Sequence, residues 1–113
     1  MGKMALQGWI QLPSTQVFDG AIAIVGLDDV TLIDSPSRRM AETLIEPVNG
    51  SLARIPFQLD VDESLSPRNS YVLTAEVRRL RKDRIQSGDF LTTVAVPWSP
   101  GDWGEAVVPV SQI

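Results

Sequence analysis

The sequence predicts an all-β protein: a seven-stranded antiparallel β-sandwich of immunoglobulin-like size, in one domain covering residues 1–113. Three observations support this prediction. Short apolar segments alternate with clusters of turn-forming residues about every 10–15 positions, a rhythm typical of sandwiches and barrels. Several segments alternate apolar and polar residues strictly, which only a strand period of two explains. The composition, with 43% apolar and 21% charged residues, is that of a globular domain able to bury a core.

Seven apolar segments are expected to form the strands. In chain order they are Ala5–Leu12, Ala21–Asp28, Met40–Pro47, Ala53–Val61, Tyr71–Leu80, Phe90–Val96 and Glu105–Val110. The alternation is clearest from Ile55 to Val61 and from Tyr71 to Val77, where apolar residues occupy every second position. The residues expected to face inward form the predicted core: Ile10, Ala23, Val25, Leu27, Ile55, Phe57, Leu59, Leu73, Ala75, Val77, Leu91, Val94 and Val108.

Turn and proline chemistry adds detail to this arrangement. Asn49-Gly50 lies between two apolar segments and predicts a tight hairpin, because a primed turn needs positive φ at both central residues. Pro56 and Pro109 lie inside strand patterns, where proline cannot donate to the ladder. Each therefore predicts an edge strand or a bulge, which favours a sandwich with open edges over a closed barrel.

Two segments are ambiguous on local pattern. Residues 36–46 follow Ser35, and a serine N-cap before a proline fits a helix start, although the same stretch also fits a strand. Residues 76–86 are rich in helix formers but continue a clear strand. We interpret the second segment as a long hairpin with its turn near Ser87-Gly88.

Missing residue types limit the chemistry. The chain has no cysteine and no histidine, which excludes disulfides, thiolate nucleophiles, Cys/His zinc sites and Ser-His-Asp triads. No phosphate-binding loop, nucleophile elbow or metal motif is present. The sequence therefore predicts a protein that is not an enzyme, with no catalytic, cofactor-binding or metal-ligating residues. The net charge of −4 argues against nucleic acid as a partner, and no apolar run reaches the roughly 18–20 residues of a membrane span.

A cluster of basic residues is one candidate partner-binding feature. Half of the ten basic residues lie within seven positions: Arg78, Arg79, Arg81, Lys82 and Arg84. Such a basic hairpin suits an acidic peptide, a lipid headgroup surface or a phosphate group. The alternative is a projecting hairpin whose charges keep it soluble and prevent edge pairing.

The loop 96–104 is a second candidate, because it carries Trp98 and Trp103 among prolines and glycines. Tryptophan is enriched in binding hot spots, so this loop is suited to contact a partner or to hold a small ligand or ion. Alternatively, the two rings cap the open end of the sandwich. Asp102 is placed to accept an indole N–H under either interpretation.

Two other aromatic residues and two acidic clusters have simpler interpretations. Trp9 shares a strand face with Gln7 and Gln11 and is either a surface anchor or a packed edge residue, of which we favour the second. Tyr71 begins a strand after a turn, where its hydroxyl can bond to neighbouring backbone. The carboxylates at 28–29 and 60–63 are suited to calcium or to acid–base work, but the 60–63 run lacks the glycine and distal glutamate of a calcium loop, and Asp28 and Asp29 are favoured as turn formers.

Several stretches in order resemble one known family. They are Leu27–Asp34 (LDDVTLID) followed by Ser35-Pro36, Met40-Ala41-Glu42, Ile55–Asp60 (IPFQLD), Ser66–Tyr71 (SPRNSY) leading into Val72–Val77, and Val107–Val110 (VVPV). Together they resemble the YbaY-like lipoproteins, grouped with the YscW-type pilotin lipoproteins of type III secretion. The resemblance implies a small β-sandwich attached to an outer membrane, and a strand rather than a helix at Met40–Pro47. It also implies, for the pilotin branch, that the protein helps place a secretin ring by binding its subunit.

These observations predict an envelope-associated accessory or chaperone-like domain that binds a protein or peptide partner and needs no cofactor. An extended peptide adding to an edge strand is the expected mode of binding. The alternative is a small-ligand or ion-binding module that uses the Trp98–Trp103 loop. The cell envelope is implied by the resemblance, but residues 1–12 show no signal-peptide pattern and the family's lipid-carrying cysteine has no counterpart, so a cytoplasmic location stays open.

Overall fold

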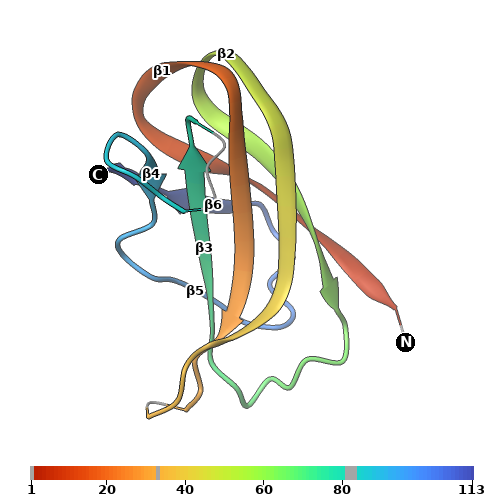
Figure 1. Ribbon diagram of the computed structural model, residues 1–113. Coiled ribbons are helices and arrows are strands. Elements are labelled where there is room, and N and C mark those ends of the chain that lie inside the picture. Colours follow the sequence, from red (N-terminus) through yellow and green to blue (C-terminus); the bar gives the residue numbers. More distant parts are fainter. Residues whose placement is uncertain (1, 33, 81–83) are drawn as a thin grey trace.

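The protein is an all-β molecule, as predicted (Figure 1). A computed structural model describes residues 2–32, 34–80 and 84–113. Its strands are β1 Lys3–Asp29, β2 Arg38–Asp62, β3 Tyr71–Arg78, β4 Phe90–Leu91, β5 Val96–Trp98, β6 Ala106–Pro109 and β7 Ser111–Gln112. Among the described residues, no helix has the length and apolarity needed to cross a membrane.

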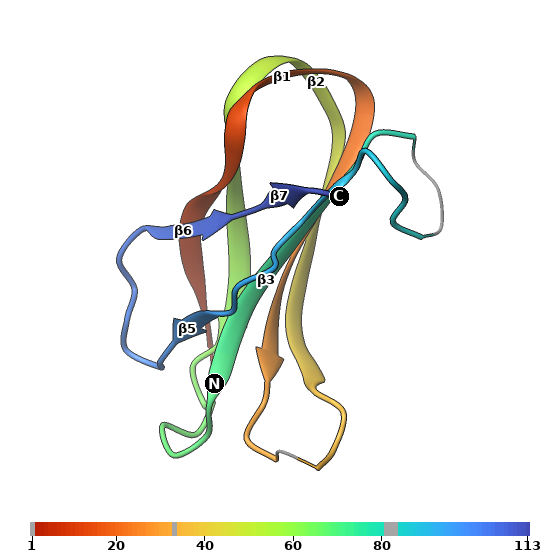
Figure 2. The ribbon, with the colours of Figure 1, turned by 90° about the vertical axis from the view of Figure 1, so that its left-hand side faces the viewer.

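The first two strands are very long because each continues through a bend. A strand of 27 residues such as β1 would run about 90 Å if straight, whereas the longest dimension of the molecule is 39 Å. β1 and β2 pair antiparallel along their whole length, and register shifts between Gln11 and Gln16 and between Asp19 and Ala23 mark the bend. Bulges of this kind sharpen twist and bend. The two-stranded ribbon therefore folds back over itself as an arch (Figure 2).

The two halves of the arch lie in different layers of a sandwich. In the first layer, here called the β3 layer, the C-terminal half of β1 pairs with the first half of β2 and with β3, which also pairs with β4 and β5. In the second, the β6 layer, the N-terminal half of β1 pairs with the second half of β2 and with β6. The β1–β6 pairing is parallel and the other pairings are antiparallel. β7 pairs with β4, so the C-terminal chain crosses from the β6 layer to the β3 layer.

The predicted sandwich is confirmed, but its strands are divided differently. Ala5–Leu12 and Ala21–Asp28 are the two halves of β1, and Met40–Pro47 and Ala53–Val61 are the two halves of β2. The strand interpretation of residues 36–46 is confirmed from Arg38 onward.

The hairpin predicted at Asn49-Gly50 is wrong. Both residues lie inside β2, opposite Asp19 and Phe18 of β1. Gly50 has φ 96° and Gly20 has φ 77°, and the side-chain oxygen of Asn49 accepts a 2.6 Å hydrogen bond from the backbone N–H of Gly20. The positive φ that the dipeptide permits is used to bend a paired ribbon and does not reverse a single chain.

Both proline predictions are confirmed. β2 stands at the end of the strand order and pairs only with β1 among the described strands, so Pro56 lies on an edge. Pro109 ends β6, which pairs only with β1 in the same part of the chain. A missing N–H at these positions therefore leaves no gap inside a ladder.

The predicted core is buried except at two positions. Val94 is 75% exposed and Leu91 is half-buried, while Phe90 is fully buried. The predicted strand Phe90–Val96 is broken after Leu91, because Thr92 uses its side-chain oxygen to accept from the backbone N–H of Ala75 at 2.9 Å. The regular ladder ends at this side-chain bond. Beyond it, apolar residues no longer face inward at every second position, as Val94 shows.

The hairpin after β3 is shorter than predicted. β3 ends at Arg78, and the chain returns as β4 through a turn in which the N–H of Asp89 donates to the carbonyl of Gln86 at 3.0 Å. Gly88, with φ 95°, supplies the left-handed residue of this turn, which agrees with the predicted position. Arg81 and Lys82 of the basic cluster lie outside the described residues.

Tyr71 stabilises the start of β3 as expected. It is buried, and its hydroxyl donates to the carbonyl of Ser66 at 3.0 Å across the preceding turn. Its ring packs edge to face on Trp98, with ring centroids 6.1 Å apart. Burial, together with the nearby charge of Asp29, raises the pKa of Tyr71 above its usual value of 10.0.

The Tyr71→Phe variant tests this contact. We expect it to lower the free energy of unfolding by about 1 kcal/mol, because it keeps the ring packing but removes the hydroxyl's bond and leaves the Ser66 carbonyl with only the 3.3 Å bond from the backbone N–H of Asn69. Urea denaturation at neutral pH measures the difference. An unchanged urea midpoint would contradict a stabilising role for the hydroxyl.

Candidate functional site

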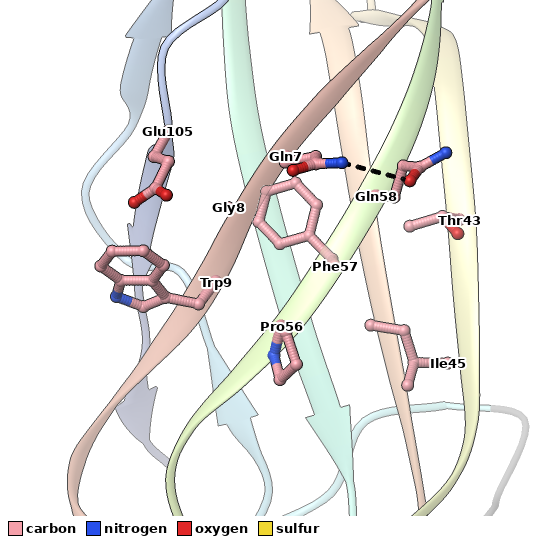
Figure 3. A pocket seen from close by; sticks show the side chains of 9 residues that line it. All are labelled: Gln7, Gly8, Trp9, Thr43, Ile45, Pro56, Phe57, Gln58 and Glu105. Carbon is pink, nitrogen blue, oxygen red and sulfur yellow. Dashed lines mark hydrogen bonds between the residues drawn. The ribbon is translucent and has the colours of Figure 1, made fainter.

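An open groove of about 580 Å³ lies beside the β1–β2 ladder (Figure 3). Its lining comes from β1, from both halves of β2 and from the segment before β6: Gln7, Gly8, Trp9, Thr43, Ile45, Pro56, Phe57, Gln58 and Glu105. The arch brings these segments together, since Thr43 and Ile45 precede the bend of β2 whereas Phe57 and Gln58 follow it.

Strand register arranges the outer surface of the β6 layer in rows. Leu6, Gly8 and Ile10 are buried, so the alternate residues of β1 face outward. Trp9 lies opposite Pro56 of β2 on one side and Val107 of β6 on the other. These three residues form an apolar row, here called the Trp9 row, across the outer face.

The Trp9 row is partly open to solvent. Trp9 is half-buried, Pro56 is exposed, and Val107 is 41% exposed. The guanidinium carbon of Arg54 lies 4.6 Å from the centroid of the Trp9 ring, a cation–π contact that holds the ring against the sheet. Trp9 is thus both a packed residue, as the sequence favoured, and a surface residue.

Amide side chains border the Trp9 row on both sides. Toward the start of β1, the side-chain N–H of Gln7 donates to the side-chain oxygen of Gln58 at 3.5 Å (Figure 3). Toward the bend, the side-chain N–H of Gln11 donates to the carbonyl oxygens of Leu12 and Ala53, at 3.1 and 3.2 Å. The site therefore combines an apolar strip with amides that can bond to a peptide.

Gly8 permits β1 and β6 to approach closely beside this groove. A side chain at Gly8 would collide with the backbone of Ala106, its partner in the parallel pairing with β6. Phe57 is the cross-strand partner of Gly8 on β2, and its ring lies over the glycine (Figure 3). Such aromatic–glycine pairs restore apolar contact where the glycine has no side chain to pack.

The site has opposite charges at its two ends. Arg54 lies opposite Gln11 at one end, while Glu105 lines the groove near Gln7 at the other. Asp60, which lies two residues beyond Gln58 on β2, is exposed like Glu105. Within the described residues, neither carboxylate forms an ion pair or a hydrogen bond with a side chain. In the same part of the chain, no group of three or more acidic residues is placed to hold a metal ion.

The structure places the described members of the basic cluster away from this groove, at the β3–β4 end: Arg78, Arg79 and Arg84. Arg78 forms a 2.8 Å ion pair with Glu76. Arg79 donates to the carbonyl of Val17 at 2.9 Å and to the side-chain oxygen of Gln16 at 2.7 Å. Arg84 is exposed, and Arg81 and Lys82 lie outside the described residues.

Arg79 therefore has a structural use. Its guanidinium carbon lies 4.9 Å from the ring centroid of Phe18 and 5.3 Å from that of Phe90, which are packed against each other. Together with its bonds to Gln16 and Val17, this contact ties the end of β3 to the bend of β1. Partner contact by the basic cluster stays a prediction, in which Arg84 is the described member facing solvent.

Alanine substitutions at Arg79 and Arg84 test whether Arg79 stabilises the fold while Arg84 does not. We expect Arg79→Ala to lower the free energy of unfolding by about 1–3 kcal/mol, because it removes three hydrogen bonds from a charged group, to Gly88, Val17 and Gln16, and the contact with two rings. Arg84→Ala is the matched control and should change stability by less than about 0.5 kcal/mol. Urea denaturation of the two variants measures both values. Equal effects would contradict the structural role of Arg79.

The tryptophans of the loop 96–104 pack at one end of the sandwich. Trp98 is only 5% exposed, and its indole N–H donates to the backbone carbonyl of Asp102 at 2.8 Å. The Trp103 ring meets it edge to face, with centroids 5.4 Å apart. The hollow beside the loop measures about 160 Å³. These contacts are those of the capping interpretation, while ligand or partner binding by the loop stays a prediction.

Three carboxylates of the acidic clusters have partners inside the molecule: Asp28, Asp29 and Asp62. Asp28 forms a 2.6 Å ion pair with Arg39. Asp29 accepts from the side chain and the backbone N–H of Thr31, and these bonds lower the pKa of Asp29 below its usual 3.8. Asp62 accepts from the backbone N–H and the hydroxyl of Ser64, which lowers the pKa of Asp62 in the same way. The turn-forming role is confirmed for Asp29 and Asp62, whereas Asp28 is instead an ion-pair partner.

Acid should destabilise the protein through these turns. Because the folded-state pKa values of Asp29 and Asp62 lie below 3.8, their stabilising effect is complete above the unfolded-state pKa. It is lost as the pH falls from about 4 through the folded-state values. Urea midpoints between pH 5 and 2 should fall less for the Asp29→Asn/Asp62→Asn double variant than for the natural chain. Parallel losses in the two proteins would contradict this assignment.

The sequence predicted that Trp9 lies on a strand face with Gln7 and Gln11, but not that Pro56 and Val107 lie beside it. The alternation of Gln7, Trp9 and Gln11 was a readable signal that all three face outward. The neighbours across the sheet were not readable, because Val107 joins Trp9 through a parallel pairing between residues almost a hundred positions apart. No local pattern encodes such a pairing.

Comparisons with known proteins agree with this architecture. No family model matches the sequence, and no curated protein matches it either. Among solved structures, the chain is similar to an alternative pilotin from the type II secretion system of Vibrio cholerae, with a TM-score of 0.76 and 19% sequence identity. The match covers 98% of this chain and 97% of that one. At this identity, the likeness shows that the two proteins share a fold.

Proposed function

We propose that this protein is a non-enzymatic, envelope-associated accessory protein that binds a segment of a partner protein, as a pilotin does. The fold shared with a pilotin over nearly the whole chain supports this role. The observation that carries the proposal for this chain itself is the Trp9 row, which lies partly open to solvent beside this groove. The proposed docking surface consists of this row, its bordering glutamines and the groove.

The chemistry of the surface fits protein recognition. Tryptophan and arginine are the residue types most enriched in binding hot spots, and here Arg54 holds the Trp9 ring in place before any partner arrives. A ring that is already ordered loses little conformational entropy on binding. The amides of Gln7 and Gln58 can exchange their mutual bond for bonds to a peptide.

The family resemblance suggests the partner. If the chain acts as the YscW-type pilotins do, the bound segment belongs to a secretin subunit. β2 is an edge strand within the described part of the chain, so an extended segment on the docking surface can also add main-chain hydrogen bonds along that edge. In this proposal the basic cluster, with Arg84 as its exposed described member, is a second and separate region that contacts the partner.

Peptide binding tests the proposal. Overlapping peptides that cover the secretin subunit of the same genome are measured by fluorescence anisotropy against the purified protein. We expect at least one to bind, and Trp9→Ala to weaken it by about tenfold or more, the loss typical of a hot-spot residue. Val94→Ala, which shortens an exposed apolar side chain elsewhere, is the control and should bind like the natural chain.

Two outcomes would contradict the proposal. If no peptide binds, the secretin partner is wrong. If a peptide binds equally well to the natural chain and to Trp9→Ala, the docking surface lies elsewhere, and Arg84→Glu then tests the basic region. Circular dichroism of Trp9→Ala confirms that any loss of binding does not come from unfolding.

A further inference from the structure

Resting on the docking role proposed above, we infer that the docking surface selects a partner segment in which a lysine or arginine accompanies an apolar anchor residue. The anchor sits on the Trp9 row, and the basic group lies between the carboxylates of Glu105 and Asp60. The charges and the register of the β6 layer carry this inference.

The charge and polarity of the outer face change from row to row along the strands. The row of Gln11 carries Arg54, the next row carries Trp9 with Pro56, and the row after that carries Gln7 with Gln58. Glu105 precedes Ala106, the partner of Gly8, so it is level with Gln7 in the parallel register. Asp60 lies one row further, opposite Ala5. Over these rows the face passes from basic through apolar to acidic, and Lys3 and Asp62 occupy the row beyond Asp60.

The carboxylates at the acidic end are free to bind a partner, whereas the guanidinium at the basic end is already in contact with Trp9. Arg54 already lies on the Trp9 ring, 4.6 Å from its centroid. Glu105 and Asp60 are exposed, and no salt bridge within the described residues involves either of them. By contrast, the nearest acidic residue along β2, Asp62, has its carboxylate bonded to Ser64. A cation from outside would therefore meet two uncommitted carboxylates.

Register also sets the distance between the two contacts. Successive outward rows on a strand are separated by two residues, which is about 7 Å. A basic group near the row of Gln7 is thus about 7 Å from an apolar side chain on Trp9. An extended segment meets this spacing with a basic residue two positions from its apolar anchor. Glutamine side chains at Gln7 and Gln58 can bond to the backbone between them.

A random-peptide library displayed on phage tests this selectivity without assuming the partner. The library is selected in parallel on the natural chain, on Trp9→Ala and on the Asp60→Asn/Glu105→Gln double variant, whose amides keep the shape of the carboxylates. The matched control is Asp19→Asn/Asp34→Asn, which makes the same change in net charge at two exposed residues away from this face. Circular dichroism verifies the fold of each variant.

On the natural chain and on the control, we expect enriched peptides to carry lysine or arginine within two positions of an aromatic or large aliphatic residue. The best peptide, made synthetically, should bind the Asp60→Asn/Glu105→Gln variant about tenfold more weakly. The same loss should follow when its basic residue is replaced by glutamine. Higher salt should weaken binding to the natural chain more than binding to the double variant.

The remaining outcomes separate the two proposals. Enriched peptides without basic residues that still lose binding on Trp9→Ala would overturn the charge selectivity and keep the docking surface. Peptides that bind Trp9→Ala as tightly as the natural chain would overturn the docking surface itself. A library that yields no enrichment on the natural chain would overturn both.

Discussion

The pairing of β1 with β2 on both sides of the bend is the constraint on which the structure depends. Because the two strands pair from Lys3↔Asp62 to Asp29↔Arg38, with register shifts at the bulges, one ribbon supplies strands to both layers of the sandwich. A slip of one residue would move every inward side chain to the outer face. The bulges and the positive φ of Gly20 and Gly50 allow the bend without breaking the ladder.

The same ladder explains why the docking surface exists. An arch built from two strands leaves β2 at an edge of both layers among the described strands, and it places residues from both halves of β2 around one groove. β6 then joins the outer side of β1, where Gly8 permits the close approach of Ala106. Trp9 consequently stands in the middle of a three-stranded face and has neighbours on both sides.

Residue types that suggest binding turn out to have different roles at different places. Arg79 and Trp98 have their polar hydrogens bonded inside the molecule and their apolar surfaces packed against aromatic rings. Such residues stabilise the fold, and using them for a partner would first cost their internal contacts. Trp9 and Glu105 differ because the fold leaves part of the indole ring and the carboxylate open to solvent. Exposure to solvent and the lack of an internal partner therefore distinguish candidate binding residues from structural ones better than residue type does.

The sequence by itself determined the all-β class, most of the core and the turn chemistry, because alternation and turn residues act over a few positions. Ile55, Phe57 and Leu59 are buried as their spacing requires, and Tyr71 bonds to its turn. Only the tertiary structure decided that Asn49-Gly50 bends a ribbon, since the same positive φ serves a hairpin or a bend until a paired strand is present. It also decided that Val107 lies beside Trp9 and that Glu105 is level with Gln7. These contacts join segments that are distant in the sequence. They form because the two layers bury their apolar inner faces against each other, and no local pattern specifies which distant segments then become neighbours.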